Sequence, residues 1–113
     1  INPAPNETVK KDFDELHTKI IESGIVPKHL QLSYAEVVRW DDQTELLAHK
    51  DMYGSKFAII MYLNDDYQGG KTFIGKTDIT PKRGRMVGFY GSRIEHGVTK
   101  IKGTRYTIPL WYK

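Results

Sequence analysis

The segment that decides the fold class of this chain is FAIIMYL, residues 57–63. Successive side chains of a β-strand point to opposite faces, and here both sets are apolar. A strand that is apolar on both faces is expected between two covering layers, as an inner strand of a sandwich is. Turn-forming residues bound the segment, with Gly54-Ser55 before it and Asn64-Asp65-Asp66 after it. The segment therefore predicts a strand inside a layered β structure.

Similar short segments follow one another on both sides of it, rich in β-branched and aromatic residues and separated by turn residues. The predicted strands are Tyr34–Trp40, Leu46–His49, Lys56–Leu63, Lys71–Ile74, Arg85–Tyr90 and Thr104–Tyr112. The spacing has room for roughly seven or eight strands with no helix between them, which favours an antiparallel sandwich or barrel.

One amphipathic helix is predicted before the strands, over residues 8–23. Its apolar residues recur at helical spacing, as Val9, Phe13, Leu16 and Ile20. Asn6 or Thr8 is expected to cap its start after a proline-rich loop, and Gly24 to end it. We therefore predict a mainly β (α+β) protein, a double-stranded β-helix or jelly roll over about residues 34–113 with one N-terminal helix, forming a single domain over residues 1–113.

The composition restricts the possible partners and sites. The chain contains no cysteine, which excludes disulfides and thiolate ligands and leaves histidine and carboxylate as the strong metal ligands. The net charge is +3, and no basic stripe with interleaved aromatic residues is present, so no nucleic-acid partner is predicted. No apolar stretch approaches the ~18 residues of a membrane span and no secretory signal opens the chain. We expect a soluble protein of the cytoplasm with no membrane partner.

Two histidines and one carboxylate form the candidate metal site. His49 and Asp51 are two residues apart, so on a strand they point to the same side, and His96 must arrive from a different strand. This is the ligand set of a non-haem Fe(II) oxygenase, which leaves coordination positions open. The other two histidines, His17 and His29, are expected to have no role in the site.

Arg105 is the second unusual feature, because it opens an otherwise apolar strand. Alternation places Thr107, Pro109 and Trp111 on its face of the strand, and Tyr106, Ile108, Leu110 and Tyr112 on the other. An arginine there is costly to bury without an anionic partner. It is either a solvent-exposed residue at a strand edge or a guanidinium that binds a carboxylate through two hydrogen bonds.

These residues stand in a pattern that resembles a known family. From Val37 onward the chain resembles the catalytic core of the Fe(II)/2-oxoglutarate-dependent dioxygenases, in particular the prolyl hydroxylase branch. The matching segments, in order, are Val38-Arg39-Trp40, His49-Lys50-Asp51, Tyr62-Leu63-Asn64-Asp65, Gly69-Gly70-Lys71-Thr72, Pro81-Lys82-Arg83-Gly84-Arg85, His96-Gly97-Val98 and Gly103-Thr104-Arg105-Tyr106 with Leu110-Trp111-Tyr112.

The resemblance implies a role for each matching residue. It implies that His49, Asp51 and His96 bind iron, that Arg105 binds the distal carboxylate of 2-oxoglutarate, and that Tyr62 donates a hydrogen bond to it. It also places Trp40 and Ile60 in the cosubstrate pocket. Trp40 stands where many relatives have a tyrosine, and Pro109 where some have a hydroxyl residue.

The resemblance also implies the reaction. Fe(II), 2-oxoglutarate and O2 are the expected cofactors, with ascorbate as reductant, and the expected reaction hydroxylates an aliphatic C–H bond with release of succinate and CO2. A peptidyl proline is the favoured substrate, in a peptide or protein partner. A free amino acid, a lysyl side chain and a small metabolite remain open. The alternative is a jelly-roll module that binds a metal or metabolite without catalysis.

Overall fold

Strand β11 (Arg105–Tyr112) is the central strand of the larger sheet. The computed structural model describes residues 7–52 and 54–113. In the larger sheet β11 pairs on one side with β4 (Phe57–Tyr62), which in turn pairs with β8 (Met86–Phe89). On its other side β11 pairs first with β2 (Val38–Trp40) and then with β1 (Leu32–Ala35). All these pairings are antiparallel.

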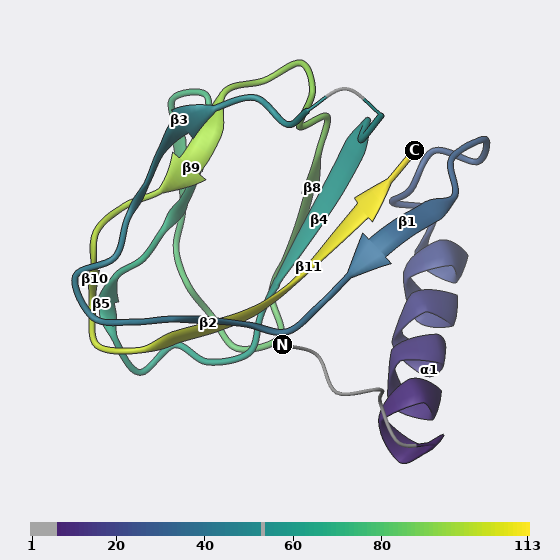
Figure 1. Ribbon diagram of the computed structural model, residues 1–113, viewed down its shortest axis with the longest axis horizontal. Helices are drawn as coiled ribbons and strands as arrows, with labels where there is room; N and C mark the ends of the chain where they lie inside the picture. Colours follow the sequence, from purple (N-terminus) through teal and green to yellow (C-terminus); the bar gives the residue numbers. More distant parts are fainter. Residues whose placement is uncertain (1–6, 53) are drawn as a thin grey trace.

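A second antiparallel sheet faces the first one (Figure 1). Its four strands lie in the order β3 (Leu46–His49), β9 (His96–Val98), β6 (Thr72–Ile74) and β7 (Thr77–Ile79). A short pair, β5 (Gln68–Gly69) with β10 (Ile101–Lys102), lies between the two sheets at one end. The prediction of a mainly β jelly roll with one helix is confirmed.

Helix α1 (Glu7–Ser23) lies alongside the larger sheet, on the side away from β3 and β9 (Figure 1). The core on this side joins the helix and the loop after it to β4 and β11, through Ile20, Val26, Leu30, Phe57, Ile59, Ile108, Leu110 and Tyr112. Gly24 follows the helix with a φ of 77°, a left-handed conformation that glycine adopts at little cost. The predicted end of the helix is therefore confirmed. The predicted loop over residues 2–6 and the Asn6 cap lie outside the described residues.

The two faces of β11 contact two different parts of the protein interior. Ile108, Leu110 and Tyr112 belong to the core under the helix. Arg105, Thr107, Pro109 and Trp111 instead line a cavity between the two sheets. In β4, Ala58 and Ile60 line the same cavity, whereas Phe57 and Ile59 face the helix side. The alternation predicted for both strands is confirmed, and β4 is apolar on both faces because each of its faces packs against a different part of the interior.

The predicted single strand Tyr34–Trp40 is wrong, because the structure divides it into β1 and β2. In the register with β11, Ala35 lies opposite Leu110 and Val38 opposite Thr107, so the break at Glu36 lies opposite Pro109. The Glu36 amide donates to the Pro109 carbonyl at 3.4 Å, but Pro109 has no N–H to return the bond. The ladder is weakened at that one position and the strand ends there.

Four strands of two or three residues are missing from the predicted ranges, namely β5, β7, β9 and β10, although His96 of β9 was expected to lie on a strand of its own. A segment this short contains too few side chains to show a period of two. No described helix is long and apolar enough to cross a membrane.

Candidate metal centre

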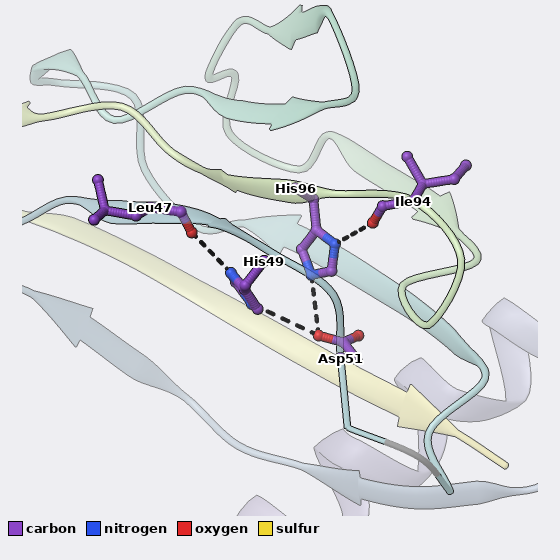
Figure 2. Close-up of polar contacts among 5 residues, drawn as sticks. All are labelled: Leu47, His49, Asp51, Ile94 and His96. Carbon is purple, nitrogen blue, oxygen red and sulfur yellow. Dashed lines mark hydrogen bonds and ion pairs between the residues drawn. The ribbon is translucent and has the colours of Figure 1, made fainter.

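His49, Asp51 and His96 come together at one end of the smaller sheet (Figure 2). His49 is the last residue of β3 and His96 the first of β9, and the two are direct partners across the ladder. Asp51 follows β3 by two residues. One ligand atom of each residue lies within 4.8 Å of the others, a spacing at which the three could hold one metal ion. The prediction that His96 arrives from a second strand is confirmed.

Both imidazole rings are oriented in the same way. The Nδ1 of His49 lies 2.9 Å from the Leu47 carbonyl, and that of His96 lies 2.8 Å from the Ile94 carbonyl. Since a carbonyl oxygen only accepts, each Nδ1 carries the proton and donates it. Both Nε2 atoms then face Asp51 (Figure 2). The Nε2 of His49 lies 3.8 Å from Asp51 Oδ1, and that of His96 lies 3.0 Å from it. The Nε2 atoms of the two histidines are therefore the ones that could bind a metal, while the Nδ1 atoms donate to backbone carbonyls.

The Asp51 carboxylate is partly buried, with its side chain 13% exposed. Its backbone amide donates to the Gly91 carbonyl at 2.9 Å. Its Oδ1 is shared by the two histidines, whereas Oδ2 is buried and has no hydrogen-bond partner among the described residues. A buried carboxylate oxygen without a partner is destabilising, and a bound cation would remove that cost.

The pKa of His96 is higher than that of an ordinary histidine, so its imidazole binds a proton more tightly. Burial lowers its pKa, but the hydrogen bonds with Asp51 and with the Ile94 carbonyl and the charge of Asp51 outweigh burial, so the pKa is raised above 6.5. Because Nδ1 donates to Ile94, His96 can donate to Asp51 through Nε2 only in its protonated form. A divalent cation between Nε2 and Oδ1 would take the place of that proton. Two imidazoles and one carboxylate, with an orphaned carboxylate oxygen, fit Fe(II).

The triad opens onto a cavity of about 120 Å³ between the two sheets. The same cavity reaches Arg105, so its wall contains both the candidate metal ligands and the arginine. The remaining lining residues are mostly apolar: Val38, Trp40, Leu46, Ala58, Ile60, Thr72, Phe89, Gly97, Val98, Thr107, Pro109 and Trp111. Trp40 and Ile60, both predicted as pocket residues, are among them.

Arg105 is a buried cation, with only 1% of its surface exposed. Its Nη2 donates to Thr72 Oγ1 at 3.0 Å, and its Cζ lies 4.9 Å from the Trp40 ring centre and 5.3 Å from that of Tyr62. Among the described residues, no carboxylate is paired with it, and its Nε has no hydrogen-bond partner. Burial lowers the pKa of Arg105. The alternative of a solvent-exposed arginine is therefore wrong, and a buried guanidinium without a carboxylate partner among the described residues is suited to bind an anion.

Tyr62 lies beside Arg105, but its hydroxyl is already occupied. It accepts from the Thr72 amide at 2.9 Å, and it lies 2.9 Å from Thr72 Oγ1 and 3.2 Å from the Ile79 carbonyl, either of which can accept its proton. Sequence reasoning missed Thr72, which is buried and links Tyr62 to Arg105. The only signal was its place after Gly69-Gly70 in the family pattern, because threonine is common in any strand.

Tyr67 is another residue near Arg105 that the sequence did not identify. Burial raises the pKa of Tyr67 to about 12, against the opposing charge of Arg105. Its hydroxyl has no hydrogen bond among the described residues. The remaining histidines are not part of the triad: His17 contacts the Tyr112 hydroxyl at 3.2 Å between helix and sheet, and His29 is exposed.

Comparison with known proteins agrees with this arrangement. Residues 35–113 match the family model described as the 2OG-Fe(II) oxygenase superfamily. Human prolyl 3-hydroxylase 2 is 35% identical over 65 residues, which cover 50% of this chain and 9% of that protein. The chain thus spans a small part of the curated relatives that it matches.

Solved structures share the fold at low sequence identity. A 2OG-Fe(II) oxygenase family oxidoreductase from Burkholderia pseudomallei has a TM-score of 0.79 and 12% identity, covering 99% of this chain and 59% of its own. A prolyl hydroxylase from Trichoplax adhaerens, in complex with a hypoxia inducible factor oxygen degradation domain peptide fragment, has a TM-score of 0.71 and 19% identity. That match covers 92% of this chain and 56% of the Trichoplax chain.

Proposed function

The chain belongs to the 2OG-Fe(II) oxygenase superfamily, and we propose that it carries the catalytic site of an Fe(II)- and 2-oxoglutarate-dependent hydroxylase. The observation that carries the proposal is the shared cavity. His49, Asp51 and His96 line it together with the buried Arg105, which has no carboxylate partner among the described residues. A cation site and a carboxylate site in one cavity suit a short dicarboxylate that binds a metal at one end and a guanidinium at the other.

The proposed roles follow from the contacts. His49 and His96 offer Nε2 to the metal while the Leu47 and Ile94 carbonyls hold their outer nitrogens. Asp51 offers its carboxylate. Arg105 binds the distal carboxylate of 2-oxoglutarate, with Trp40 and Ile60 in the wall and Tyr62 in place beside it. Thr72 orients Arg105 by accepting from Nη2, and Tyr62 in turn holds Thr72.

With O2 as the oxidant, bound iron and 2-oxoglutarate would supply oxidative decarboxylation to succinate and CO2 coupled to hydroxylation of a C–H bond, with one oxygen atom of O2 entering succinate and the other the hydroxyl group. The protein keeps water from the reacting centre with the apolar walls of the cavity, which include Val98, Phe89 and Trp111. We propose ascorbate as the reductant that keeps the iron in its Fe(II) state.

A peptidyl proline is the substrate that we propose. Two similarities support it: the human relative is a prolyl 3-hydroxylase, and the Trichoplax neighbour was solved with a peptide. The loops that we expect to select the substrate are Asp41–Glu45, Lys50–Ser55 and Tyr67–Ile79. The last of these ranges contains β5, β6 and β7, so we expect only the turns between these strands to adapt their shape to a substrate. In the range Lys50–Ser55, residue 53 lies outside the described part of the chain. A free amino acid, a lysyl side chain or a small metabolite are the other outcomes of the test.

The test measures succinate formation with Fe(II), ascorbate and 2-oxoglutarate, with mass spectrometry of proline-containing peptides. We expect succinate release that depends on both iron and 2-oxoglutarate, and a gain of one oxygen atom on a proline residue. A protein that binds Co(II) and 2-oxoglutarate but turns over no substrate would instead be a binding module. A protein that binds neither would contradict the proposal altogether.

A further inference from the structure

Three loops lie at the end of the cavity that carries the candidate metal ligands. The first leads from β3 to β4 (residues 50–52 and 54–56), the second leads from β8 to β9 (residues 90–95), and the third is the turn between β6 and β7 (residues 75–76). Figure 1 shows all three at the upper end of the view. We call these three loops the rim.

Backbone hydrogen bonds hold the three loops of the rim together. The Asp51 amide donates to the Gly91 carbonyl at 2.9 Å, which joins the first loop to the second. The Gly75 amide donates to the Glu95 carbonyl at 2.7 Å, which joins the third loop to the second. The rim is therefore one continuous surface beside the triad.

This surface is basic. Apart from the candidate ligand Asp51, the charged residues of the rim are four cations and one anion, namely Lys50, Lys56, Lys76, Arg93 and Glu95. All five are exposed, and none of them forms an ion pair with another described residue. A divalent metal ion on the triad would add further positive charge to this end of the cavity.

The other end of the cavity has no such excess of positive charge. The segments there, residues 41–45, 63–71, 80–85 and 99–104, contain five acidic and six basic residues. Two of the acidic residues are already in ion pairs, Asp41 with Arg39 and Glu45 with Lys100. Unbalanced positive charge is thus concentrated beside the triad, where it raises the local concentration of anions.

Arg93 is the cation of the rim that the structure holds in one place. Its Cζ lies 4.9 Å from the Tyr90 ring centre, and its backbone amide donates to the Tyr90 carbonyl at 2.9 Å. Tyr90 in turn contacts the buried Phe57 edge-on, with 5.1 Å between the ring centres. The guanidinium has no hydrogen-bond acceptor among the described residues, so its N–H groups are available to bind a carboxylate through two hydrogen bonds.

Exposed apolar side chains lie among these cations. Met52 is 76% exposed, Ile94 39% and Tyr90 37%. A polypeptide can supply both carboxylates for the cations and apolar side chains for this surface. A nucleic acid would supply phosphates for the cations but would leave the surfaces of Met52 and Ile94 without apolar partners. The rim therefore favours a peptide that carries acidic residues.

We propose that the rim binds acidic residues of a peptide substrate on either side of the residue that is hydroxylated, and that Arg93 binds one of their carboxylates. The inference rests on the proposed function and adds the chemical class of the residues that flank the target. It also assigns a substrate-selecting role to residues 90–95, which the sequence did not predict.

The first test compares peptides that differ only in charge. Three fluorescent peptides of equal length each carry one proline, flanked on both sides by glutamate, glutamine or lysine. Their affinities for protein loaded with Zn(II) and 2-oxoglutarate are measured by fluorescence anisotropy. We expect the glutamate peptide to bind at least tenfold more tightly than the glutamine peptide, and the lysine peptide to bind most weakly. The difference should shrink as the ionic strength rises from about 0.05 to about 0.3 M, because exposed charges are screened by salt.

The second test changes the charge of Arg93. Arg93→Gln is expected to weaken binding of the glutamate peptide about fivefold, on the scale of one exposed charge-assisted contact, and to leave the glutamine peptide unaffected. Arg83→Gln is the matched control, because it removes the same charge from an exposed arginine at the other end of the cavity. Arg93→Glu should weaken the glutamate peptide further and strengthen the lysine peptide, a reversal that a purely structural role of Arg93 would not produce.

The outcomes separate this inference from the proposed function. Protein that binds Zn(II) and 2-oxoglutarate but binds the glutamate and glutamine peptides equally, or loses as much affinity in Arg83→Gln as in Arg93→Gln, overturns the inference and leaves the proposed function standing. Displacement of the glutamate peptide by a lower concentration of a single-stranded oligonucleotide of equal charge would also overturn it, in favour of a nucleic-acid partner. Protein that binds the glutamate peptide through Arg93 but binds neither Zn(II) nor 2-oxoglutarate contradicts the proposed function instead.

Discussion

Gly91 accepts a hydrogen bond from the Asp51 backbone and also leaves space for the Asp51 side chain. Its carbonyl accepts the hydrogen bond from the Asp51 amide at 2.9 Å, and a β-carbon on its α-carbon would collide with Asp51 Oδ2. Gly91 is therefore the residue between β8 and β9 that leaves room for the carboxylate. Its φ lies outside the left-handed region, so the requirement for glycine here is one of space rather than of backbone conformation.

Gly91→Ala is expected to displace the Asp51 carboxylate and to weaken Co(II) binding by tenfold or more, roughly 1.4 kcal/mol. Calorimetry on the metal-free protein provides the measurement. A double-mutant cycle on unfolding free energy is the control: the cost of Gly91→Ala should largely vanish in an Asp51→Ala background, where no carboxylate remains to collide. An equal cost in both backgrounds would mean that the added methyl group destabilises the protein through a contact other than the one with the Asp51 carboxylate.

His96→Ala should remove most of the metal affinity, because it deletes one of the three candidate ligands. We expect the Co(II) dissociation constant to rise by at least two orders of magnitude, on the scale of roughly 3 kcal/mol. His29→Ala is the matched control, since His29 is exposed and distant in the sequence from the triad. Wild-type metal content in purified His96→Ala protein would contradict the ligand assignment.

The metal affinity should rise with pH. The pKa of His96 is raised above 6.5, so at pH 6 its Nε2 carries a proton that the metal must displace. That proton stabilises the metal-free fold below pH 6.5, and the contribution is lost as the pH rises through the raised value. The difference in Tm between metal-bound and metal-free protein should therefore widen from pH 6 to pH 8. A difference that is constant over this range would exclude a proton at the His96–Asp51 contact.

Arg105→Met is expected to raise the stability of the ligand-free protein while weakening its binding of 2-oxoglutarate. Arg105 is buried without a carboxylate partner among the described residues, so replacing it with an apolar residue of similar length should stabilise the ligand-free fold, by about 1 kcal/mol. The same change removes the proposed partner of the 2-oxoglutarate carboxylate, and we expect the binding free energy of 2-oxoglutarate to weaken by about 3 kcal/mol. Urea unfolding and calorimetry on the Zn(II)-loaded protein measure the two effects. Metal affinity is the control and should not change.

Tyr62→Phe should act mainly on stability. It removes the acceptor of the buried Thr72 amide and a partner of Thr72 Oγ1. A buried donor left unpaired costs about 1–3 kcal/mol, so the urea midpoint should fall with an unchanged m-value. A variant with wild-type stability but weakened 2-oxoglutarate binding would show instead that Tyr62 contacts the cosubstrate directly.

The sequence by itself determined the features that depend on local periodicity and on residue type. Alternation in residues 105–112 was sufficient to place Arg105 on the opposite face of its strand from Leu110, and helical spacing located α1. The absence of cysteine and the pair His49-x-Asp51 limited the possible metal ligands on residue type alone. These features are predictable because each depends on residue identity or on residues a few positions apart.

The tertiary structure decided everything that depends on register between distant segments. The β3–β9 pairing brings His96 beside His49, and the β2–β11 pairing places Trp40 against Arg105. The break between β1 and β2 depends on Pro109 lying opposite Glu36, and the Tyr62 hydroxyl is occupied because β6 brings Thr72 to it. Strand register is set by the packing of whole sheets and by turn geometry, which no local pattern contains. For this reason the sequence could identify the candidate ligands, whereas only the fold could show which of their donors and acceptors remain unpaired.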